Sequence, residues 1–397
     1  MSRVISVVYL VSSLAVEGPL GGVARFVVEL VRALDRTQVQ PAVAALWDYG
    51  TPGEPRWRER LLAEGIPVFI GAPWDPAHPY RSCVRALWGL HRSGLQKADI
   101  LHSHGEFSDL AAWWLQKRLG ARVLVRTVHN EIEWAKRPLF GRMFGGVLLP
   151  LVFHAEWGVS RQVVRRLNTR WVARQKHKQA QVMYNALDFT RFESPNREAG
   201  RMLRVALNIP PQALLVGNVG RLVPQKGHAV LLQAFALLRT SWPQVHLVVA
   251  GDGPLADFLH QETKRLHLEG HVHWLGPRQD IETVLAALDL FVSSSLWEGL
   301  PTVILEALAA QVPVVATRVS GSTELLNEGE YGILVPPGDA GSLAQGMDQA
   351  LRELKTWRRR AQTALPRLRS MFSIRNVAHQ HIQAYRTLLA PLQASRQ

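Results

Sequence analysis

The sequence predicts an α/β protein with two domains, each built on a parallel sheet covered by helices. Length is the first observation, because 397 residues exceed the roughly 100–200 residues of a typical domain. Composition is the second, since 47% hydrophobic and 20% charged residues are typical of globular chains with buried cores. The third is a repeated alternation of short apolar strands with amphipathic helical segments, which favours parallel sheets with helices on both faces.

Short apolar segments along the whole chain have the length expected of buried strands. In the first half they are Val4–Val11, Val39–Leu46, Val68–Ile70, Ile100–Ser103, Val123–Thr127, Glu156–Val159 and Gln181–Tyr184. In the second half they are Leu214–Val219, His246–Ala250, Val272–Leu275, Leu290–Ser293, Val314–Ala316 and Gly332–Val335. Helices are expected between most of them, at Gly22–Leu34, Phe107–Leu119, His228–Leu238, Leu255–Leu266, Ile281–Leu288, Thr302–Ala310 and Ala340–Leu354.

The boundary between the two runs of strand–helix units is predicted at Asp188–Pro211. This segment is rich in charge, Asn and Pro and weak in apolar periodicity, as expected of a hinge. We therefore expect a first domain over residues 1–188 and a second over residues 189–372. A last helix near Asn376–Leu389 has no strand after it, so it has to dock on a domain that is already folded.

The start of the chain has one arginine followed by an apolar run, a pattern shared by signal peptides and first strands. We favour a strand, because the glycines Gly18, Gly21 and Gly22 and a segment with helical apolar spacing follow at once. No segment approaches the roughly 20 apolar residues that a membrane-spanning helix needs, so none is predicted. The single cysteine, Cys83, excludes an intramolecular disulfide and a cysteine-based metal site, which suits a cytoplasmic protein.

The net charge of +14 is concentrated in the first half of the chain. Residues 1–190 hold 25 Lys and Arg against 15 Asp and Glu, and Arg161–Lys178 holds seven basic residues and no acid. Such a run is commonly a solvated helix face, and it is also able to attract an anionic membrane, a nucleic acid or an acidic glycan. No recognition helix, zinc finger or aromatic RNA-binding motif accompanies it, so nucleic acid is not an expected partner.

Glycine-rich turns at strand ends are candidate phosphate sites, because the next helix presents free N–H groups there. Neither Gly-x-Gly-x-x-Gly after the first strand nor a P-loop occurs. Arg221 and Lys226 flank a turn between Gly220 and Gly227, and two long cations there could hold a diphosphate. Two solvated surface charges are the alternative interpretation.

Two carboxylates, Glu298 and Glu306, lie eight residues apart across a turn and the helix that follows it. The backbone N–H groups of Leu300 to Val303 lie between them at the expected helix start. A diphosphate on that helix N-terminus would leave one carboxylate near a sugar and the other near the ribose hydroxyls.

Here the sequence resembles the retaining glycosyltransferases of family four, which have the GT-B fold. The resemblance is carried by residues 295–317 (SLWEGLPTVILEALAAQVPVVAT), 320–324 (SGSTE), 332–339 (GILVPPGD), 219–227 (VGRLVPQKG), 250–255 (AGDGPL), 275–280 (LGPRQD), 100–104 (ILHSH), 127–129 (TVH) and 184–192 (YNALDFTRF). These motifs occur in order along nearly the whole chain. Two positions depart from the family pattern, since Gln311 and Ala186 stand where glycine is usual, and both put local turn geometry in doubt.

The resemblance implies two Rossmann-like domains facing across a cleft that holds the donor sugar. Residues 1–188 would bind the acceptor, residues 189–372 would bind the donor, and the helix within 373–397 would cross back onto the first domain. The implied catalytic residues are His129, at the reacting sugar, and Glu298, at the donor sugar and phosphates. The other implied donor-binding residues are Arg221 and Lys226 at the diphosphate, Glu306 at the ribose, and the backbone of Gly22, Gly299 and Leu300 near the phosphates.

The implied reaction moves a sugar, most simply a hexose, from a nucleotide-diphosphate sugar to an acceptor hydroxyl with retained anomeric configuration. Polysaccharide, lipopolysaccharide or glycolipid synthesis is the expected setting, with a glycan or lipid-linked acceptor whose binding residues the sequence does not identify. No metal cofactor is expected, because no Asp-x-Asp motif occurs. A cytoplasmic protein, drawn to the inner face of an anionic membrane by its basic run, fits the charge distribution.

Two other functions are compatible with the same fold. One is a nucleotide-sugar epimerase, which product analysis with and without an acceptor distinguishes from a transferase. The other is a non-catalytic protein that binds a glycan or a nucleotide sugar. The joint presence of Arg221, Lys226, Glu298, Glu306 and His129 argues against the second.

Overall fold

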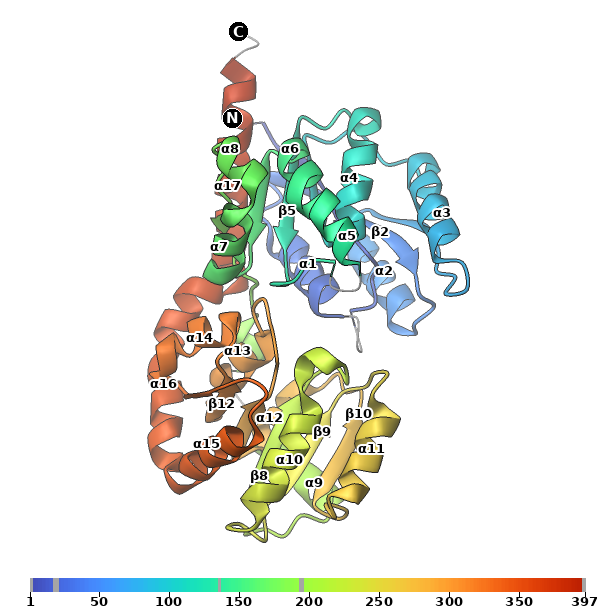
Figure 1. Cartoon of the computed structure of the whole chain (residues 1–397). Helices are drawn as coiled ribbons and strands as arrows, with labels where there is room; N and C mark the ends of the chain where they lie inside the picture. The colour runs from blue at the N-terminus through green and yellow to red at the C-terminus, as the bar shows by residue number, and fades with distance from the viewer. Residues whose placement is uncertain (1–2, 17–20, 135–136, 193–195, 395–397) are drawn as a thin grey trace. The chain divides into compact units, whose positions relative to one another are not determined.

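The computed structural model describes residues 3–16, 21–134, 137–192 and 196–394, and these form two compact units (Figure 1). Unit 1 comprises Met1–Ala186 and Ile374–Gln397, and unit 2 comprises Leu187–Ser373. The sequence-based boundary after residue 188 lies two residues beyond the structural one, after Ala186. The turn at Gly18, part of the sequence argument for a first strand, lies outside the described residues.

Unit 1 is built on a parallel seven-stranded sheet with the order β3-β2-β1-β4-β5-β6-β7. Its strands are β1 (Ile5–Val11), β2 (Val39–Asp48), β3 (Val68–Pro73), β4 (Ile100–His104), β5 (Val123–Val128), β6 (Ala155–Gly158) and β7 (Gln181–Val182). Every pairing between them is parallel. The apolar start of the chain is therefore a central strand of this sheet, as the strand interpretation predicts.

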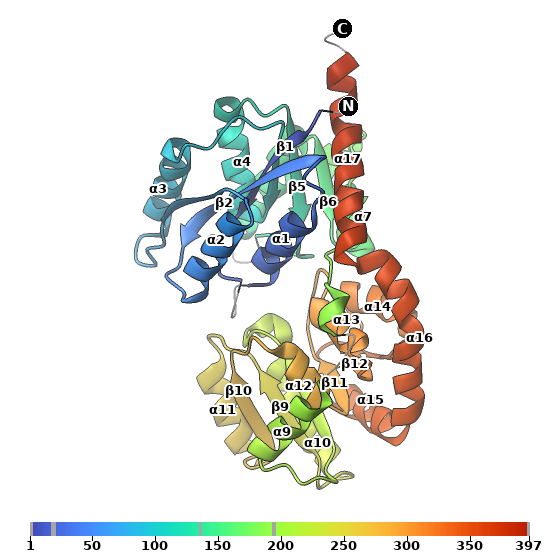
Figure 2. The same ribbon diagram turned by 180° about the vertical axis from the view of Figure 1, so that it is seen from behind.

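Helices cover both faces of this sheet. They are α1 (Gly21–Ala33), α2 (Gly53–Ala63), α3 (Pro79–Arg92), α4 (Glu106–Leu119), α5 (Pro138–Phe140), the π-helix η1 (Gly141–Leu148), α6 (Leu149–Val152), α7 (Arg161–Thr169), α8 (Trp171–Gln175) and α17 (Ile374–Ala394). The helices α1, α2 and α17 share one core with the sheet, whereas α3, α4 and α6 share another core on the opposite face. Figure 2 shows α1, α2 and α17 on the side of the sheet that is turned away in Figure 1.

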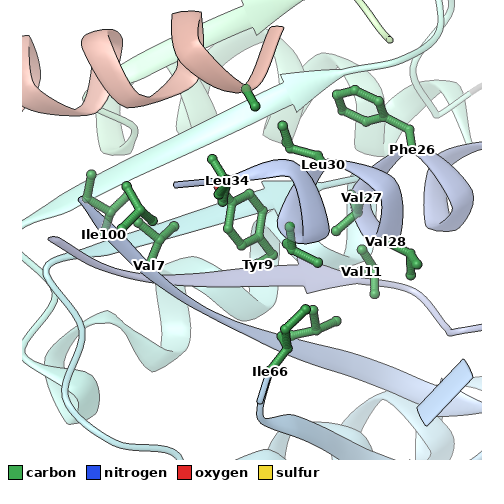
Figure 3. Close-up of a cluster of buried hydrophobic side chains, with 14 of the residues drawn as sticks. Val7, Tyr9, Val11, Phe26, Val27, Val28, Leu30, Leu34, Ile66 and Ile100 are labelled. Carbon is green, nitrogen blue, oxygen red and sulfur yellow. The ribbon is translucent and has the colours of Figure 1, made fainter. Parts of the chain in front are cut away.

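Strand β1 shows how the alternation of apolar side chains fills both cores. Figure 3 shows side chains of β1 facing those of α1; the labelled residues are Val7, Tyr9, Val11, Phe26, Val27, Val28, Leu30, Leu34, Ile66 and Ile100. Val8 and Leu10 point to the other face and belong to the core under α3 and α4. Successive side chains of a strand point to opposite faces, so a strand buried on both sides is apolar throughout.

Unit 2 is a second parallel sheet, with six strands in the order β10-β9-β8-β11-β12-β13. Its strands are β8 (Leu215–Val219), β9 (His246–Ala250), β10 (Val272–Gly276), β11 (Leu290–Ser293), β12 (Val314–Thr317) and β13 (Ile333–Val335). Its helices are η2 (Phe189–Arg191), α9 (Arg197–Ala206), η3 (Pro224–Lys226), α10 (His228–Arg239), α11 (Ala256–Arg265), α12 (Ile281–Ala287), α13 (Thr302–Ala309), α14 (Ser320–Leu325), η4 (Asn327–Gly329), α15 (Ala340–Arg352) and α16 (Leu354–Phe372). Each unit thus has the strand order of a Rossmann fold.

The segment Asp188–Pro211, predicted as a hinge, contains the 10-residue helix α9 at its centre and belongs to unit 2. The Asn196 side chain accepts a hydrogen bond from the Ala199 N–H at 2.9 Å and begins this helix. The helix packs on α12 through Gly200, where a Cβ atom would lie 2.7 Å from the backbone of Ala286. Gly200 is the buried residue of this helix, so its closest packing contact is made by the backbone rather than by a large apolar side chain.

Two other helix predictions need correction. The helix expected over Ala340–Leu354 ends at Arg352, and a separate 19-residue helix, α16, begins at Leu354. The last helix is longer than predicted, running from Ile374 to Ala394 within unit 1, with Tyr385 and Leu389 in the core that it shares with α1. The return of this helix to the first unit, which the family resemblance implies, is therefore confirmed.

The two departures from the family pattern have different consequences. Gln311 follows α13 with a φ of 59°, in the left-handed region that favours glycine. The N–H groups of Gln311 and Val312 bond the carbonyls of Leu308 and Ala307, so the helix ends in the usual left-handed cap despite the glutamine. Ala186 has no such φ; it is 5% exposed, and its methyl group packs in the unit 1 core.

Candidate active site

The turn after β8 carries the two predicted diphosphate-binding cations. It runs through Gly220, Arg221, η3 and Gly227 to the start of α10. Gly227 has a φ of 63°, and a Cβ atom there would lie 2.2 Å from the Ser294 carbonyl oxygen. A side chain at this position is therefore excluded by both conformation and space, which lets the turn approach the neighbouring strand end.

Hydrogen bonds join this turn to the one after β11, the strand that pairs with β8. The Leu296 N–H donates to the Gln225 carbonyl at 2.7 Å, and the Ser294 hydroxyl donates to the Lys226 carbonyl at 2.8 Å. Ser294 and Ser295 are 0% and 2% exposed. The two turns thus form one rigid structure at the carboxyl ends of adjacent parallel strands, where α/β folds bind ligands.

Glu298 lies at the centre of this structure. Lys226 Nζ is 2.5 Å from Glu298 Oε1, the Ser295 hydroxyl donates to the same oxygen at 2.7 Å, and the Gln225 amide donates to Oε2 at 3.4 Å. The Glu298 side chain is 7% exposed. An ion pair this well buried is held in one geometry, so the Glu298 carboxylate is preorganised and Lys226 is oriented by it.

The backbone after Glu298 is fixed from the opposite side. The Ser320 hydroxyl, at the start of α14, donates to the Glu298 carbonyl at 2.8 Å and lies 3.3 Å from the Gly299 carbonyl. Leu300 is 6% exposed, and α13 begins two residues later at Thr302. Glu306 follows in the second turn of α13 and is 3% exposed, so the second predicted carboxylate is buried as well.

Arg221 differs from Lys226 in its surroundings. It is exposed and forms no ion pair with any residue that the structure describes, although partial burial lowers its pKa and the nearby Glu298 carboxylate opposes that shift. Of the two predicted diphosphate-binding cations, Arg221 is therefore the one that can bind an anion without first breaking an ion pair.

His129, the predicted catalytic residue of unit 1, directly follows β5. Its Nε2 lies 3.0 Å from Nδ1 of His104, the last residue of the neighbouring strand β4. His102 Nδ1 lies 2.6 Å from the Tyr385 hydroxyl of α17, and the Tyr385 hydroxyl donates to Tyr9 at 2.9 Å. The histidine pair at 102 and 104 is thus hydrogen-bonded to protein groups, and His104 orients His129.

These histidines are neutral at physiological pH. Burial lowers the pKa of His129 to about 3, although the nearby Asn185 side chain opposes this shift. Burial, with the neighbouring His102 and His129, lowers the pKa of His104 well below its usual 6.5. In the short contact between His104 and His129 one ring therefore donates its N–H and the other accepts. A neutral His129 offers a hydrogen bond and no charge.

The remaining predictions concern Gly22 and metals. Gly22 lies in the first turn of α1, and a Cβ atom there would meet no described atom within 4 Å. In the part of the chain that the structure describes, no group of three or more His, Cys, Asp or Glu residues is arranged to hold a metal ion.

Sequence reasoning missed a buried charge cluster under the β5 end of unit 1. Arg126, 1% exposed, lies 3.0 Å from both Asp109 and Glu156, and it also contacts Glu133. Burial raises the pKa of Asp109 to about 7, with Arg126 opposing the shift. The cluster combines residues from position 109 to position 156, and Arg126 is 17 and 30 positions from Asp109 and Glu156, so no local motif predicts it.

A cavity of about 340 Å³ lies beside this cluster. Its lining runs from Val128 and Asn130, on either side of His129, to Glu133 and to Arg142, Arg166 and Arg170. Arg170 is partly neutralised by Glu156, whereas Arg142 and Arg166 are exposed. Charged and apolar side chains together line this cavity, which includes the residues on either side of the candidate catalytic histidine.

Comparisons with known proteins agree with this architecture. The model of Glycosyltransferase Family 4 matches residues 20–189, and that of Glycosyl transferases group 1 matches residues 201–365. The "Putative glycosyltransferase EpsF" of Bacillus subtilis is 33% identical over 305 residues, which cover 74% of this chain and 75% of EpsF.

A second relative is the lipopolysaccharide core biosynthesis glycosyltransferase LpsE of Rhizobium meliloti. It is 36% identical over 180 residues, which cover 45% of this chain and 52% of LpsE, so the match spans about half of that relative. Among solved structures, Anabaena HepE in complex with UDP and glucose has a TM-score of 0.79 at 21% identity, covering 96% of this chain and 100% of HepE. That similarity shows the shared GT-B fold. The chain therefore belongs to the group 1 glycosyltransferases of the family-four type.

Proposed function

We propose that this chain is a retaining glycosyltransferase that moves a sugar from a nucleotide-diphosphate sugar to an acceptor hydroxyl, in polysaccharide or lipopolysaccharide synthesis. The observation that carries the proposal is the buried Lys226–Glu298 pair at the ends of β8 and β11, with Arg221 open beside it. The relatives LpsE and EpsF support a transferase. HepE, crystallised with UDP and with UDP-glucose, supports a nucleotide-sugar donor.

In this proposal the charged groups of unit 2 serve the leaving diphosphate. Arg221 and the N–H groups at the start of α13 stabilise the negative charge that develops on the diphosphate as the glycosidic bond breaks. Lys226 contributes to the same potential while holding Glu298, and Glu298 accepts hydrogen bonds from hydroxyls of the transferred sugar. Glu306 holds the ribose. His129, as a neutral imidazole, hydrogen-bonds the transferred sugar.

The acceptor is proposed to be a glycan or a lipid-linked saccharide, handled by unit 1 on the cytoplasmic side of a membrane. An epimerase of the same fold would convert the nucleotide sugar without an acceptor, whereas the transferase releases nucleoside diphosphate in proportion to a glycosylated product. Product analysis with and without acceptor separates these two activities. A protein that only binds the nucleotide sugar would give neither product.

Activity is expected to be independent of divalent metal. In the proposed site, cationic side chains and helix N–H groups stabilise the negative charge of the diphosphate without a metal ion. No Asp-x-Asp motif is present to hold a metal. Adding excess chelator should leave the initial rate within about twofold of the untreated rate. Loss of turnover in chelator, with recovery on adding Mg²⁺ or Mn²⁺, would contradict the diphosphate assignment of Arg221 and Lys226.

Replacing Glu306 by alanine is expected to raise the donor KM by about 10–100-fold with a smaller change in kcat. The proposed bonds from ribose hydroxyls to a buried carboxylate exist before and during the reaction, and bonds to a charged group contribute about 1.5–3 kcal/mol. Initial rates over a range of donor concentrations give both constants. Glu269→Ala, at an exposed carboxylate of the same unit, is the control and should retain wild-type constants.

A further inference from the structure

Exposed large hydrophobic side chains are concentrated on a few helices of unit 1. Of 18 such side chains among the described residues, 11 lie on α3, α4, the continuous helix α5–η1–α6, and α8. We call these 11 residues the aromatic face. They are Tyr80, Val84, Trp88, Trp113, Trp114, Leu139, Phe140, Met143, Val147, Leu151 and Trp171. Clusters of this kind on a globular protein mark an interaction surface.

The helices that carry this face are neighbours on one side of the sheet. The buried sides of α3, α4 and α6 share one core, so their exposed sides point away from the same sheet face (Figure 1). The rings of Trp88 on α3 and Trp114 on α4 have centroids 6.4 Å apart. The Arg137 guanidinium, just before α5, lies 5.5 Å from the Tyr80 ring of α3. The aromatic face is therefore continuous from α3 to α5.

The α5–η1–α6 helix, residues 138–152, presents its apolar side to solvent. Leu139, Met143, Val147 and Leu151 follow one another at intervals of four residues and are each at least 46% exposed. Residues at this spacing lie on one side of a helix, so they form a stripe. A stripe of this size facing water is unfavourable unless another apolar phase covers it.

Part of the basic run Arg161–Lys178 anchors this helix to unit 1. The Arg170 guanidinium donates to the Gly145 carbonyl at 2.8 Å, and the Lys178 ammonium donates to the Pro150 carbonyl at 2.9 Å near the helix end. Helix α8, which packs against η1 and α6, holds Trp171 at 73% exposure. These bonds fix the helix with its apolar stripe facing solvent. Trp171 lies in the same basic segment that holds the helix in place.

Basic residues dominate the charges around the aromatic face; of the helices that carry it, α4 also holds Glu106 and the buried Asp109 in its first turn. The segments 79–92, 138–152 and 161–178 contain no Asp or Glu. They carry basic residues whose side chains are exposed: Arg81, Arg85, Arg92, Arg142, Arg161, Arg165, Arg166, Arg174 and Lys176. Apolar and aromatic side chains interspersed with Arg and Lys are the composition of protein surfaces that lie in the headgroup region of anionic membranes.

We propose that the aromatic face docks on the surface of an anionic lipid bilayer, with residues 138–152 lying in the plane of the membrane. Met143 and Val147 then reach the acyl chains, while Arg81 and Arg85 contact lipid phosphates. The centre of a protein–protein interface is depleted in charge, whereas basic residues occur along the whole of this face, which favours lipid. None of the described helices is long and apolar enough to span a membrane, so the contact is peripheral.

Co-sedimentation of the full-length protein with vesicles tests this docking. Vesicles of phosphatidylcholine with phosphatidylglycerol should bind the protein at low salt, vesicles of phosphatidylcholine alone should bind it far less, and salt should weaken the binding. The double variant M143Q/V147Q should bind about tenfold more weakly, because two exposed apolar side chains no longer enter the lipid. The matched control M202Q/V205Q changes two exposed apolar residues on α9 of unit 2 and should bind like the wild type.

A second variant separates the charge from the apolar contribution. R81Q/R85Q, on α3, should lose roughly fivefold in affinity per arginine at low salt and less at high salt. None of these assays contains a nucleotide sugar, so their outcome is independent of the proposed transfer reaction. If the wild type fails to bind anionic vesicles at low salt, or if M202Q/V205Q loses as much binding as M143Q/V147Q, the proposed docking face is wrong.

The single cysteine allows the contact to be located directly. An environment-sensitive fluorophore on Cys introduced by Val147→Cys, in a Cys83→Ser background, should shift to the blue when anionic vesicles are added. The same fluorophore introduced by Val205→Cys should not shift. Vesicle binding without a shift at position 147 would place the membrane contact elsewhere. A concentration-dependent oligomer that M143Q/V147Q dissociates, with no vesicle binding, would instead assign the face to a protein partner.

Discussion

Replacement of Glu298 by glutamine is expected to lower kcat by about 10²–10³-fold while changing the donor KM by less than about tenfold. The substitution keeps the size of the side chain and an oxygen for the Ser295 hydroxyl, but it removes the negative charge that Lys226 neutralises. Lys226 then gains freedom to move, and the carboxylate proposed to accept the sugar hydroxyls is lost. In the proposed site both changes act near the breaking bond, so we expect the transition state to be affected more than donor binding.

Steady-state rates at saturating acceptor, together with the melting temperature, distinguish this role from a structural one. Glu269→Gln is the control, because it removes one exposed carboxylate of unit 2. If Glu298 only holds the two turns together, Glu298→Gln should lower the melting temperature and leave kcat unchanged. Kinetics close to those of the wild type would remove Glu298 from the proposed active site.

Replacement of Arg126 by methionine is expected to lower the free energy of unfolding of unit 1 by about 3–5 kcal/mol. The guanidinium is 1% exposed and compensates Asp109, Glu133 and Glu156. Without it, three carboxylates remain close together, and Arg170, which contacts Glu156, compensates only part of their charge. Removing one residue from a buried charge network lowers the free energy of unfolding by more than the intact network raises it, because the remaining charges stay desolvated.

Thiol labelling in urea measures this change. Cys83 is the only cysteine, and it lies half-buried on α3 of unit 1, so its reactivity reports the unfolding of that unit. Arg126→Met should become reactive at a clearly lower urea concentration than the wild type. Arg85→Met, at an exposed arginine of the same unit, should not. Equal transition midpoints for Arg126→Met and the wild type would show that the cluster is not a stability element.

Local patterns were sufficient to predict most of the fold. Parallel strands buried on both faces are apolar throughout, so β1 and β11 stand out in the sequence, and glycines mark the turns that follow them. The family motifs also identified Lys226, Glu298 and Glu306 as candidate site residues. They could not predict the ion pair between Lys226 and Glu298, because this bond joins two turns that lie 72 residues apart in the sequence.

Contacts at long range explain the other omissions. The hydrogen bond between His102 and Tyr385 spans 283 residues and depends on the return of α17 to unit 1. The buried ion pairs of Arg126 likewise depend on the order of strands in the sheet. Helix α9 was missed for a different reason, since its buried residue is Gly200, which packs through the backbone on α12. Gln311 was recognised as a departure, and the structure shows it in the left-handed conformation that explains the usual glycine.

Binding of a panel of nucleotide-diphosphate sugars tests the central claim most directly. Thermal unfolding of the wild type is measured with UDP-, GDP-, ADP- and dTDP-sugars, and again with the variant Arg221→Ala. A donor bound only by the folded state raises the melting temperature progressively with its concentration. We expect sugars of one nucleotide to stabilise the wild type in this way, and Arg221→Ala to require a concentration at least about tenfold higher for the same shift. No stabilisation of the wild type by any nucleotide sugar, or equal stabilisation of wild type and Arg221→Ala, would contradict the proposed donor site.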